Sequence, residues 1–261
     1  MKNKLIILEG ADGAGKSTMA KDLQNDILKK NKEIKVKVIS FPHSTSFGYK
    51  KIREVLQDPD KYPPDVLQSL FVANMIECAE KVINPFFEEN KENRIIILDR
   101  SLLSTIVYNA LNGGTIFHSI MSHTYKIANE IVPGSVSRKE LDPDILSKVY
   151  GHIIQPIDFT VFLFPPVEVL IEHSKKRESK EENDGADSVI KSFEAYISLY
   201  KFLTGSLHRD FIDFLEYSVD MLVPNTRKYD KYVGLTNWSR SKSEEQNYAA
   251  WREVVLTKLG I

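Results

Sequence analysis

The stretch that decides the fold reads Gly10-Ala11-Asp12-Gly13-Ala14-Gly15-Lys16-Ser17, between the apolar run Leu5–Leu8 and an amphipathic segment at 16–30. It fits the phosphate-binding pattern G-x-x-x-x-G-K-[ST], in the strand–loop–helix context that the pattern requires. Glycines let successive backbone N–H groups turn toward phosphate oxygens, and the helix N-terminus adds partial positive charge there. Because Asp12 stands where the dinucleotide-binding pattern G-x-G-x-x-G needs glycine, that alternative is excluded.

The polar side chains of this phosphate-binding loop (P-loop) have distinct expected roles. Lys16 can reach the β- and γ-phosphates of ATP, and the hydroxyl of Ser17 can bind Mg²⁺. The guanine-binding signature Asn-Lys-x-Asp of GTPases does not occur, and the length leaves little room for a motor protein. We expect ATP to contact Gly10, Asp12, Gly13, Ala14, Gly15, Lys16, Ser17 and Thr18.

Short apolar strands alternate with amphipathic helices along much of the chain, which predicts an α/β fold. All-apolar strands indicate a parallel sheet with helices on both faces, of about five strands and of the P-loop NTPase type. The strands are expected at 5–8, 34–38, 95–98, 159–163 and 229–235. The helices are expected at 16–30, from Pro63 to about 86, and at 165–177, 187–203 and 243–259.

Two of these helices carry local signals. Pro85 should bend or end the long helix near its C-terminus. Ser243-Glu-Glu-Gln246 matches a capping box at the start of the last helix. The apolar face of that last helix is expected to be Trp251, Val254, Val255 and Leu259.

Composition excludes several other classes of protein. The 261 residues include 35 basic and 36 acidic ones, for a net charge of −1, which argues against a protein that coats nucleic acid or an anionic membrane. The single cysteine, Cys78, rules out an intrachain disulfide and a cysteine-rich zinc site. No apolar stretch approaches the ~20 residues of a membrane-spanning helix, and no signal peptide opens the chain, so a cytoplasmic location is expected.

The chain is expected to form one domain over residues 1–261. Its core would comprise about 3–112 and 156–203, followed by the C-terminal helix at 243–259. Residues 113–157 and 205–242 are rich in polar and aromatic side chains without sustained periodicity, and they are expected to be insertions on that domain.

A second polar motif, Asp99-Arg100-Ser101, follows the strand expected at 95–98. At the carboxyl edge of a parallel sheet, Asp99 would lie beside the P-loop, where a carboxylate can hold Mg²⁺ or its waters. Arg100 could form a bidentate clamp on a second phosphate. We therefore expect Ser17 and Asp99 at the metal, and Lys16, Asp99 and Arg100 in catalysis.

Several motifs, taken in order, resemble those of the thymidylate kinase family of nucleoside monophosphate kinases. The matching segments are Leu8 to Thr18, Phe41-Pro42 with Gly48 and Ile52, Leu70 to Asn74, Asp99 to Asn109, and Leu163 to Arg177. The resemblance covers about residues 3–112 and 156–203. It implies a single P-loop nucleotide kinase domain with a short lid at about 175–187.

The resemblance also implies an acceptor site. Phe71 would stack on the acceptor base, Asp12 would accept a hydrogen bond from the sugar 3′-OH, and Arg100 would bind the acceptor phosphate. Tyr108 would press against the sugar and disfavour a ribose 2′-OH. The implied acceptor-binding residues are Asp12, Phe41, Pro42, Phe71, Arg100, Ser104 and Tyr108.

Positive charge on the transferring phosphoryl group would come from the lid. The P-loop carries no arginine at its variable positions, so the resemblance places this chain with the bacterial-type branch of the family. There Lys176, Arg177 and Lys180 would close over the phosphates, with Arg177 among the catalytic residues. Composition alone leaves a second interpretation of 174–184 open, a solvated loop of mixed charge.

Four positions depart from the family pattern. The arginine that usually follows Phe-Pro is missing, and His43-Ser44-Thr45 stand there instead. Met75 replaces the arginine after Ala-Asn, His173 replaces the arginine at the lid entrance, and Phe164 replaces an acidic residue. A pocket that loses hydrogen-bonding groups discriminates base edges less sharply, so specificity is either broader or restored by the insertions. Candidates for replacement are Arg138, Arg209, Arg227 and Arg240.

The function that these expectations favour is transfer of the γ-phosphoryl group of ATP, with Mg²⁺, to dTMP or a related deoxynucleoside monophosphate. The expected partners are these two nucleotides and a second copy of the chain in a homodimer, with no nucleic acid and no membrane. Two alternatives stay open: a deoxynucleoside kinase, whose acceptor is the nucleoside, and a non-catalytic nucleotide-binding module. Phe41-Pro42 without a following carboxylate, and Asp12, favour the monophosphate as acceptor.

Overall fold

The structure is a computed structural model, and it describes residues 2–58, 61–88, 92–112, 152–153, 157–177, 186–204 and 232–261. Most of the two expected insertions, and residues 178–185 of the expected lid, lie outside the described residues. Among the described residues, no helix is long and apolar enough to cross a membrane.

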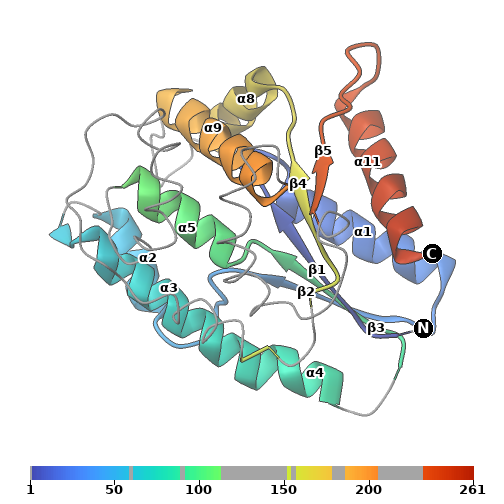
Figure 1. The fold of residues 1–261 in the computed structure, drawn as a ribbon, viewed down its shortest axis with the longest axis horizontal. Coiled ribbons are helices and arrows are strands. Elements are labelled where there is room, and N and C mark those ends of the chain that lie inside the picture. Colours follow the sequence, from blue (N-terminus) through green and yellow to red (C-terminus); the bar gives the residue numbers. More distant parts are fainter. Residues whose placement is uncertain are drawn as a thin grey trace.

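A five-stranded sheet forms the centre of the described chain (Figure 1). Its order is β2-β3-β1-β4-β5 and every neighbouring pair is parallel, which confirms the predicted α/β class. Leu8 pairs with Asp99, and Glu9 pairs with Phe162, so Glu9 and Asp99 end adjacent strands at one edge. The strands are β1 (Lys4–Glu9), β2 (Lys35–Ser40), β3 (Arg94–Asp99), β4 (Phe159–Leu163) and β5 (Tyr232–Leu235).

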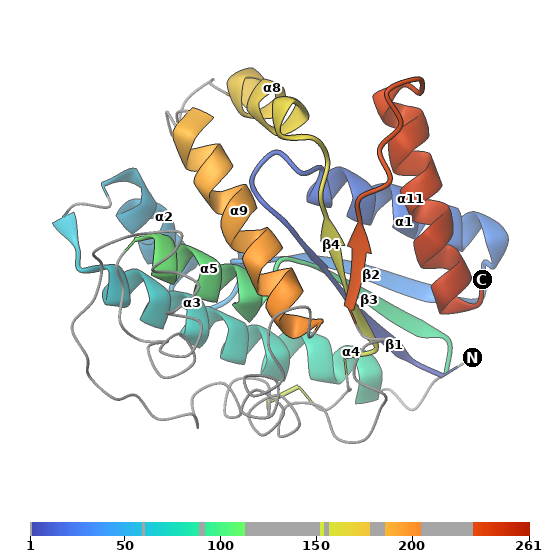
Figure 2. The ribbon, with the colours of Figure 1, turned by 45° about the horizontal axis from the view of Figure 1, so that its top comes forward.

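Helices cover both faces of this sheet, as Figure 2 shows from a second side. Alternate residues of β1 point to opposite faces: Ile6 and Leu8 pack with α1 (Lys16–Lys30) and α11 (Glu244–Leu259), whereas Leu5 and Ile7 pack with α3 (Pro64–Cys78). The remaining helices are α2 (Tyr49–Gln57), α4 (Asn84–Glu88), α5 (Leu102–Leu111), α8 (Val167–Arg177) and α9 (Ala186–Leu203).

The long helix that begins at Pro64 contains a wider turn. Between α3 and α4 lies the π-helical segment η2 (Ala79–Ile83), just before Pro85. Proline lacks an N–H and its ring clashes with the carbonyl four residues earlier, and a π turn relieves such crowding. The helix therefore continues past the proline to Glu88.

The last helix matches its sequence signals in all but one respect. The capping box is present, with Ser243 Oγ accepting from the Gln246 N–H at 3.2 Å and Gln246 Oε1 accepting from the Ser243 N–H at 2.9 Å. Trp251 and Val255 are buried, but Val254, predicted on the same face, is 47% exposed. Val255 and its neighbour Leu256 both lie in the buried stripe of α11, and Val254 lies just outside that stripe, on the side turned to solvent.

Candidate active site

The P-loop connects β1 to α1 and adopts a backbone that only glycine fits at its ends. Gly15 has φ 78° and caps α1, and a Cβ there would lie 2.6 Å from the Tyr248 hydroxyl oxygen. Gly10 has φ 147°, and a Cβ there would lie 2.8 Å from the Leu163 carbonyl oxygen. The loop is therefore fixed by close packing against α11 and the end of β4, with the side chains of Ser17 and Thr18 exposed at its mouth.

Lys16 is buried and bound to the loop itself. Its Nζ donates to the carbonyl oxygens of Gly10 and Ala11, at 2.8 and 2.7 Å. Burial, together with the Arg100 guanidinium, lowers the pKa of Lys16 to about 7. Because a nearby anion favours the charged form of a lysine, a bound phosphate would raise this pKa again.

Ser17 and Asp99 meet across the carboxyl edge of the sheet, as the sequence predicted for a strand end beside the P-loop. Ser17 Oγ donates to Asp99 Oδ2 at 2.5 Å, and the Ser40 hydroxyl lies 3.4 Å from the same oxygen. A hydroxyl and a carboxylate are hard oxygen ligands of the kind that Mg²⁺ takes, alongside waters and substrate phosphates. Among the described residues, no group of three or more His, Cys, Asp and Glu could hold a metal without such help.

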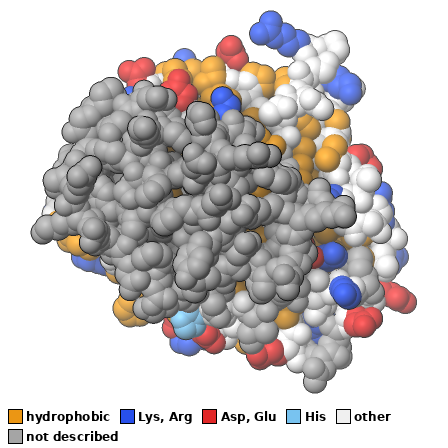
Figure 3. Space-filling view, viewed as in Figure 1, with side chains coloured by type: hydrophobic (Ala, Val, Ile, Leu, Met, Phe, Trp, Pro, Cys, Tyr) orange, Lys and Arg blue, Asp and Glu red, His pale blue; other side chains and the backbone are white. Residues whose placement is uncertain are grey.

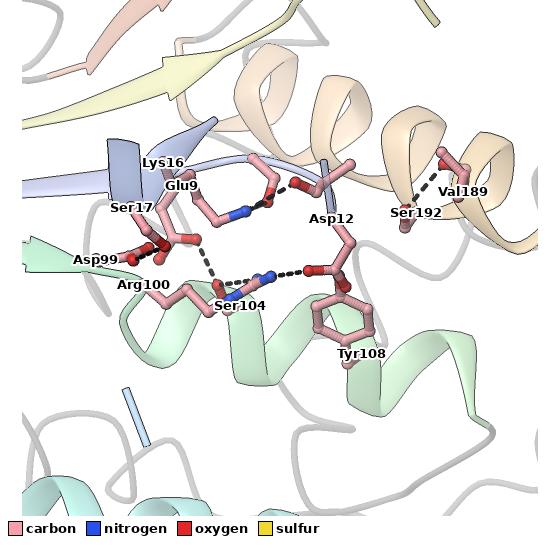
Figure 4. A network of polar contacts seen from close by, with 12 residues as sticks. Glu9, Asp12, Lys16, Ser17, Asp99, Arg100, Ser104, Tyr108, Val189 and Ser192 are labelled. Atoms are coloured by element: carbon pink, nitrogen blue, oxygen red, sulfur yellow. Dashed lines mark hydrogen bonds and ion pairs between the residues drawn. The ribbon is translucent and has the colours of Figure 1, made fainter. Parts of the chain in front are cut away.

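Arg100, Asp12 and Tyr108 form a network over the mouth of the P-loop, drawn in Figure 4. The Arg100 guanidinium forms an ion pair with Asp12 Oδ1, and the Tyr108 hydroxyl donates to Asp12 Oδ2 at 2.6 Å. The guanidinium also lies over the Tyr108 ring, 5.6 Å from its centroid. The backbone of Arg100 has φ 75°, a left-handed conformation that residues other than glycine rarely adopt. Such a conformation persists where the surroundings fix it, and here Asp12 and Tyr108 hold the guanidinium.

A buried carboxylate, Glu9, lies beneath this network, and sequence analysis did not assign it a role. Ser101 and Ser104 each donate to it at 2.6 Å, and the Tyr196 hydroxyl donates to Ser104 Oγ at 2.8 Å. Burial raises the pKa of Glu9, although both serine hydrogen bonds oppose the shift. The available signal was an acidic residue at the end of an otherwise apolar strand. Glu9 fixes the start of α5, the helix that carries Ser104 and Tyr108.

The loop after β2 is fixed to α3 by one asparagine. Asn74 Oδ1 accepts from the His43 N–H at 2.7 Å, and its Nδ2 donates to the carbonyl oxygens of His43 and Phe47, both at 3.0 Å. Phe41 is buried, precedes a cis peptide bond to Pro42, and donates its N–H to the Asp99 carbonyl at 3.0 Å. This arrangement brings Phe41 and Pro42 next to the Asp99 strand end. Phe71 on α3 packs partly buried on a separate small cluster of Ile52, Val55 and Leu67.

His173 contacts the P-loop from α8 instead of lying free at the lid entrance. Its Nδ1 donates to the Gly13 carbonyl at 2.7 Å, and its Nε2 lies 2.9 Å from Glu244 Oε1 on α11. Tyr248, also on α11, donates its hydroxyl to the Ala14 carbonyl at 3.1 Å. Sequence analysis treated His173 only as a departure and did not find Tyr248. Their partners come from segments far apart in the chain, so no local pattern reveals these contacts.

The other departures from the family pattern have structural explanations. Met75 is 3% exposed and packs in the apolar cluster between α3 and the sheet. Its side chain therefore cannot replace the hydrogen bond of the family's arginine. Phe164 is buried against the rings of Phe162 and Tyr200, where an acidic side chain would lose solvation. Arg177 is the last residue of α8, and Lys176 forms an exposed ion pair with Glu172 at 2.7 Å. Lys180 lies outside the described residues.

On the face of the molecule that Figure 3 shows, the visible described side chains include basic, acidic and apolar ones. Around the P-loop, the described cationic side chains include Lys16 and Arg100. A parallel sheet, a glycine-fixed P-loop and a strand-end aspartate paired with its serine define a P-loop nucleotide-binding protein.

Comparison with known proteins gives the family. Residues 8–134 match the family model described as thymidylate kinase. Thymidylate kinase of Thermoanaerobacter sp. (strain X514) is 30% identical over 226 residues, 82% of this chain and 97% of that protein. That of Desulfotalea psychrophila is 39% identical over 111 residues, 42% of this chain and 52% of that protein. The chain belongs to the thymidylate kinase family.

Proposed function

We propose that this protein transfers the γ-phosphoryl group of ATP to dTMP, or a related deoxynucleoside monophosphate, and yields the diphosphate. Family membership supports the reaction. The observation that carries the assignment to this chain is the Asp12–Arg100–Tyr108 network, which lies beside the Ser17–Asp99 pair. A second cationic clamp next to a P-loop suits an enzyme that holds two phosphate-bearing substrates.

The donor half of the site would hold ATP on the P-loop. Backbone N–H groups and the start of α1 would face the phosphates, and Lys16 would exchange its two carbonyl partners for phosphate oxygens. Ser17 and Asp99 would hold Mg²⁺. An ion held there would neutralise negative charge on the phosphates.

The acceptor half would use the residues around Arg100. Its guanidinium would bind the acceptor phosphate, and Asp12 would then accept from the sugar 3′-OH. Tyr108, whose hydroxyl donates to Asp12 at 2.6 Å, would press against the sugar and disfavour a 2′-OH. Phe41, Pro42, Phe71 and Ser104 would complete this side, with Glu9 as the buried support of Ser104.

Phosphoryl transfer demands mainly positioning and electrostatic stabilisation, because the protein supplies little covalent chemistry. Asp12 and Arg100 lie 88 residues apart in the chain, and their contact would hold the acceptor-binding residues next to the P-loop. Arg177 and the lid would add charge to the transferring group. Homodimer formation and a cytoplasmic location remain part of this proposal.

The acceptor profile of the purified protein with ATP and Mg²⁺ tests the proposal. ADP release would be followed with dTMP, dUMP, dGMP and thymidine as acceptors. We expect turnover of dTMP and none of thymidine, because the nucleoside offers Arg100 no phosphate. Turnover of thymidine without dTMP would instead identify a nucleoside kinase, and ATP binding without turnover of any acceptor would identify a non-catalytic module.

A further inference from the structure

Helix α3 contains two buried carboxamides with opposite environments. Asn74 is fully buried, and its amide makes the three hydrogen bonds to His43 and Phe47 described above. Gln68 is 1% exposed, yet neither its Nε2 nor its Oε1 has a hydrogen-bond partner in the part of the chain that the structure describes. The two residues can therefore be compared within one helix: the side-chain amide of Asn74 is hydrogen-bonded, and that of Gln68 has no hydrogen bond to the described residues.

An unpaired buried amide is unfavourable for folding. It has lost its hydrogen bonds to water and gained none from the protein. Native proteins contain few such groups, and each requires an explanation. A leucine at position 68 would fill similar space without the penalty, so the amide of Gln68 points to a ligand that completes its hydrogen bonds.

The position of Gln68 in the fold places it on the ligand side of the sheet. Arg94, at the start of β3, donates to the Phe86 carbonyl in α4 at 2.7 Å, whereas Asn74 holds the loop that follows β2. The long helix therefore runs antiparallel to β3, and its N-terminal part lies toward the carboxyl edge (Figure 1). Gln68 comes six residues before Asn74, about 9 Å further in that direction.

Neighbouring contacts tie this part of α3 to the residues around Arg100, where the proposed function places the acceptor. Asn109 of α5 lies 3.3 Å from Asp65, which is three residues before Gln68. The residue before Asn109 is Tyr108, the hydrogen-bond partner of Asp12. On α3, Gln68 shares a face with Met75, seven residues on, and lies one turn before Phe71. Gln68 thus provides a polar side chain at one end of this face, and the apolar Met75 lies at the other end.

We propose that the Gln68 carboxamide binds the edge of the acceptor base that carries N3–H and O4. The inference rests on the proposed function and names the residue that reads the base. A carboxamide presents an N–H donor and a carbonyl acceptor side by side, which matches the C=O and N–H of a thymine or uracil ring. It supplies both hydrogen bonds that the apolar Met75 cannot provide.

The test separates a ligand-binding amide from a structural one. Gln68→Leu and the less shape-changing Gln68→Met would be compared with wild type for Tm, for kcat and KM with dTMP, and for KM with ATP. We expect the Tm to rise by about 2–4 °C. We expect kcat/KM for dTMP to fall about tenfold or more, with the KM for ATP unchanged. Asn74→Leu is the matched control, and its Tm should fall because it leaves three backbone groups of the β2 loop unpaired.

A substrate analogue adds a readout that a purely structural role would not move. N3-methylated dTMP lacks the N3–H, so wild type should discriminate against it, and the Gln68 variants should lose most of that discrimination. An unchanged kcat/KM for dTMP, a lowered Tm, or full discrimination in the variants would overturn the inference while leaving dTMP turnover by wild type intact. Absence of dTMP turnover by wild type would instead overturn the proposed function and this inference together.

Discussion

The phosphate-binding half of the site and the base-facing surface of α3 are built on different principles. Around the P-loop, Lys16, Asp99 and Arg100 each have a polar partner, and two of the contacts join the P-loop to the end of β3 and the residue after it. On α3, Met75 is apolar, and the Gln68 amide has no hydrogen-bond partner among the described residues. On the function proposed above, this contrast predicts that phosphate binding is preorganised by the protein, whereas base recognition is completed by the substrate.

The largest effect that this contrast predicts is at Arg100. Arg100→Ala should lower kcat/KM for dTMP by about 10²–10³-fold, because it removes a preorganised cation from the acceptor phosphate. Arg100→Lys should recover only part of the activity, since an ammonium cannot bind two phosphate oxygens in fork geometry. Steady-state kinetics with dTMP varied at saturating ATP measures both variants. Unchanged turnover in Arg100→Ala would show that the acceptor phosphate binds elsewhere.

A middle-sized effect should appear in the pH dependence of ATP binding. The pKa of Lys16 is lowered to about 7 without ligand, and anionic phosphates would raise it, so binding above pH 7 takes up a proton. Affinity for ATP should therefore weaken as pH rises above about 7, by at most about tenfold per pH unit. Calorimetry in buffers of different ionisation enthalpy measures the uptake. Lys16→Arg keeps the charge without titrating near neutrality, so equal proton uptake in that variant would exclude Lys16 as the source.

The smallest effect is expected at Met75. Met75→Leu keeps the volume and the apolar character of a buried side chain, so it should change the KM for dTMP by less than about threefold and lower stability only slightly. The same kinetic assay and a thermal melt measure these changes. A large rise in the KM for dTMP would show that Met75 contributes directly to base binding, and the contrast between the two regions would weaken.

Sequence reasoning succeeded where the signal is local. The P-loop, the Asp99-Arg100 pair, the five strands and the capping box at Ser243 are each written in consecutive residues, and the structure places them as expected. Helices α2 and α5 were not predicted, although α5 carries Ser104 and Tyr108. The sequence at 102–111 contains no charged residue, so it lacks the charged face that identifies a surface helix.

The sequence by itself determined that this chain has a phosphate-binding loop and a kinase-like α/β fold. The loop is a run of consecutive residues, and the alternation of strands and helices is a local pattern, so both can be recognised without the tertiary structure. Only the tertiary structure decided what surrounds that loop. Glu9 accepts hydrogen bonds from Ser101 and Ser104, and His173 donates to Gly13. Gln68 has no polar partner among the described residues. Whether such pairings form depends on which strands and helices, distant in sequence, come within hydrogen-bond distance of one another. No local pattern of residue types can specify this.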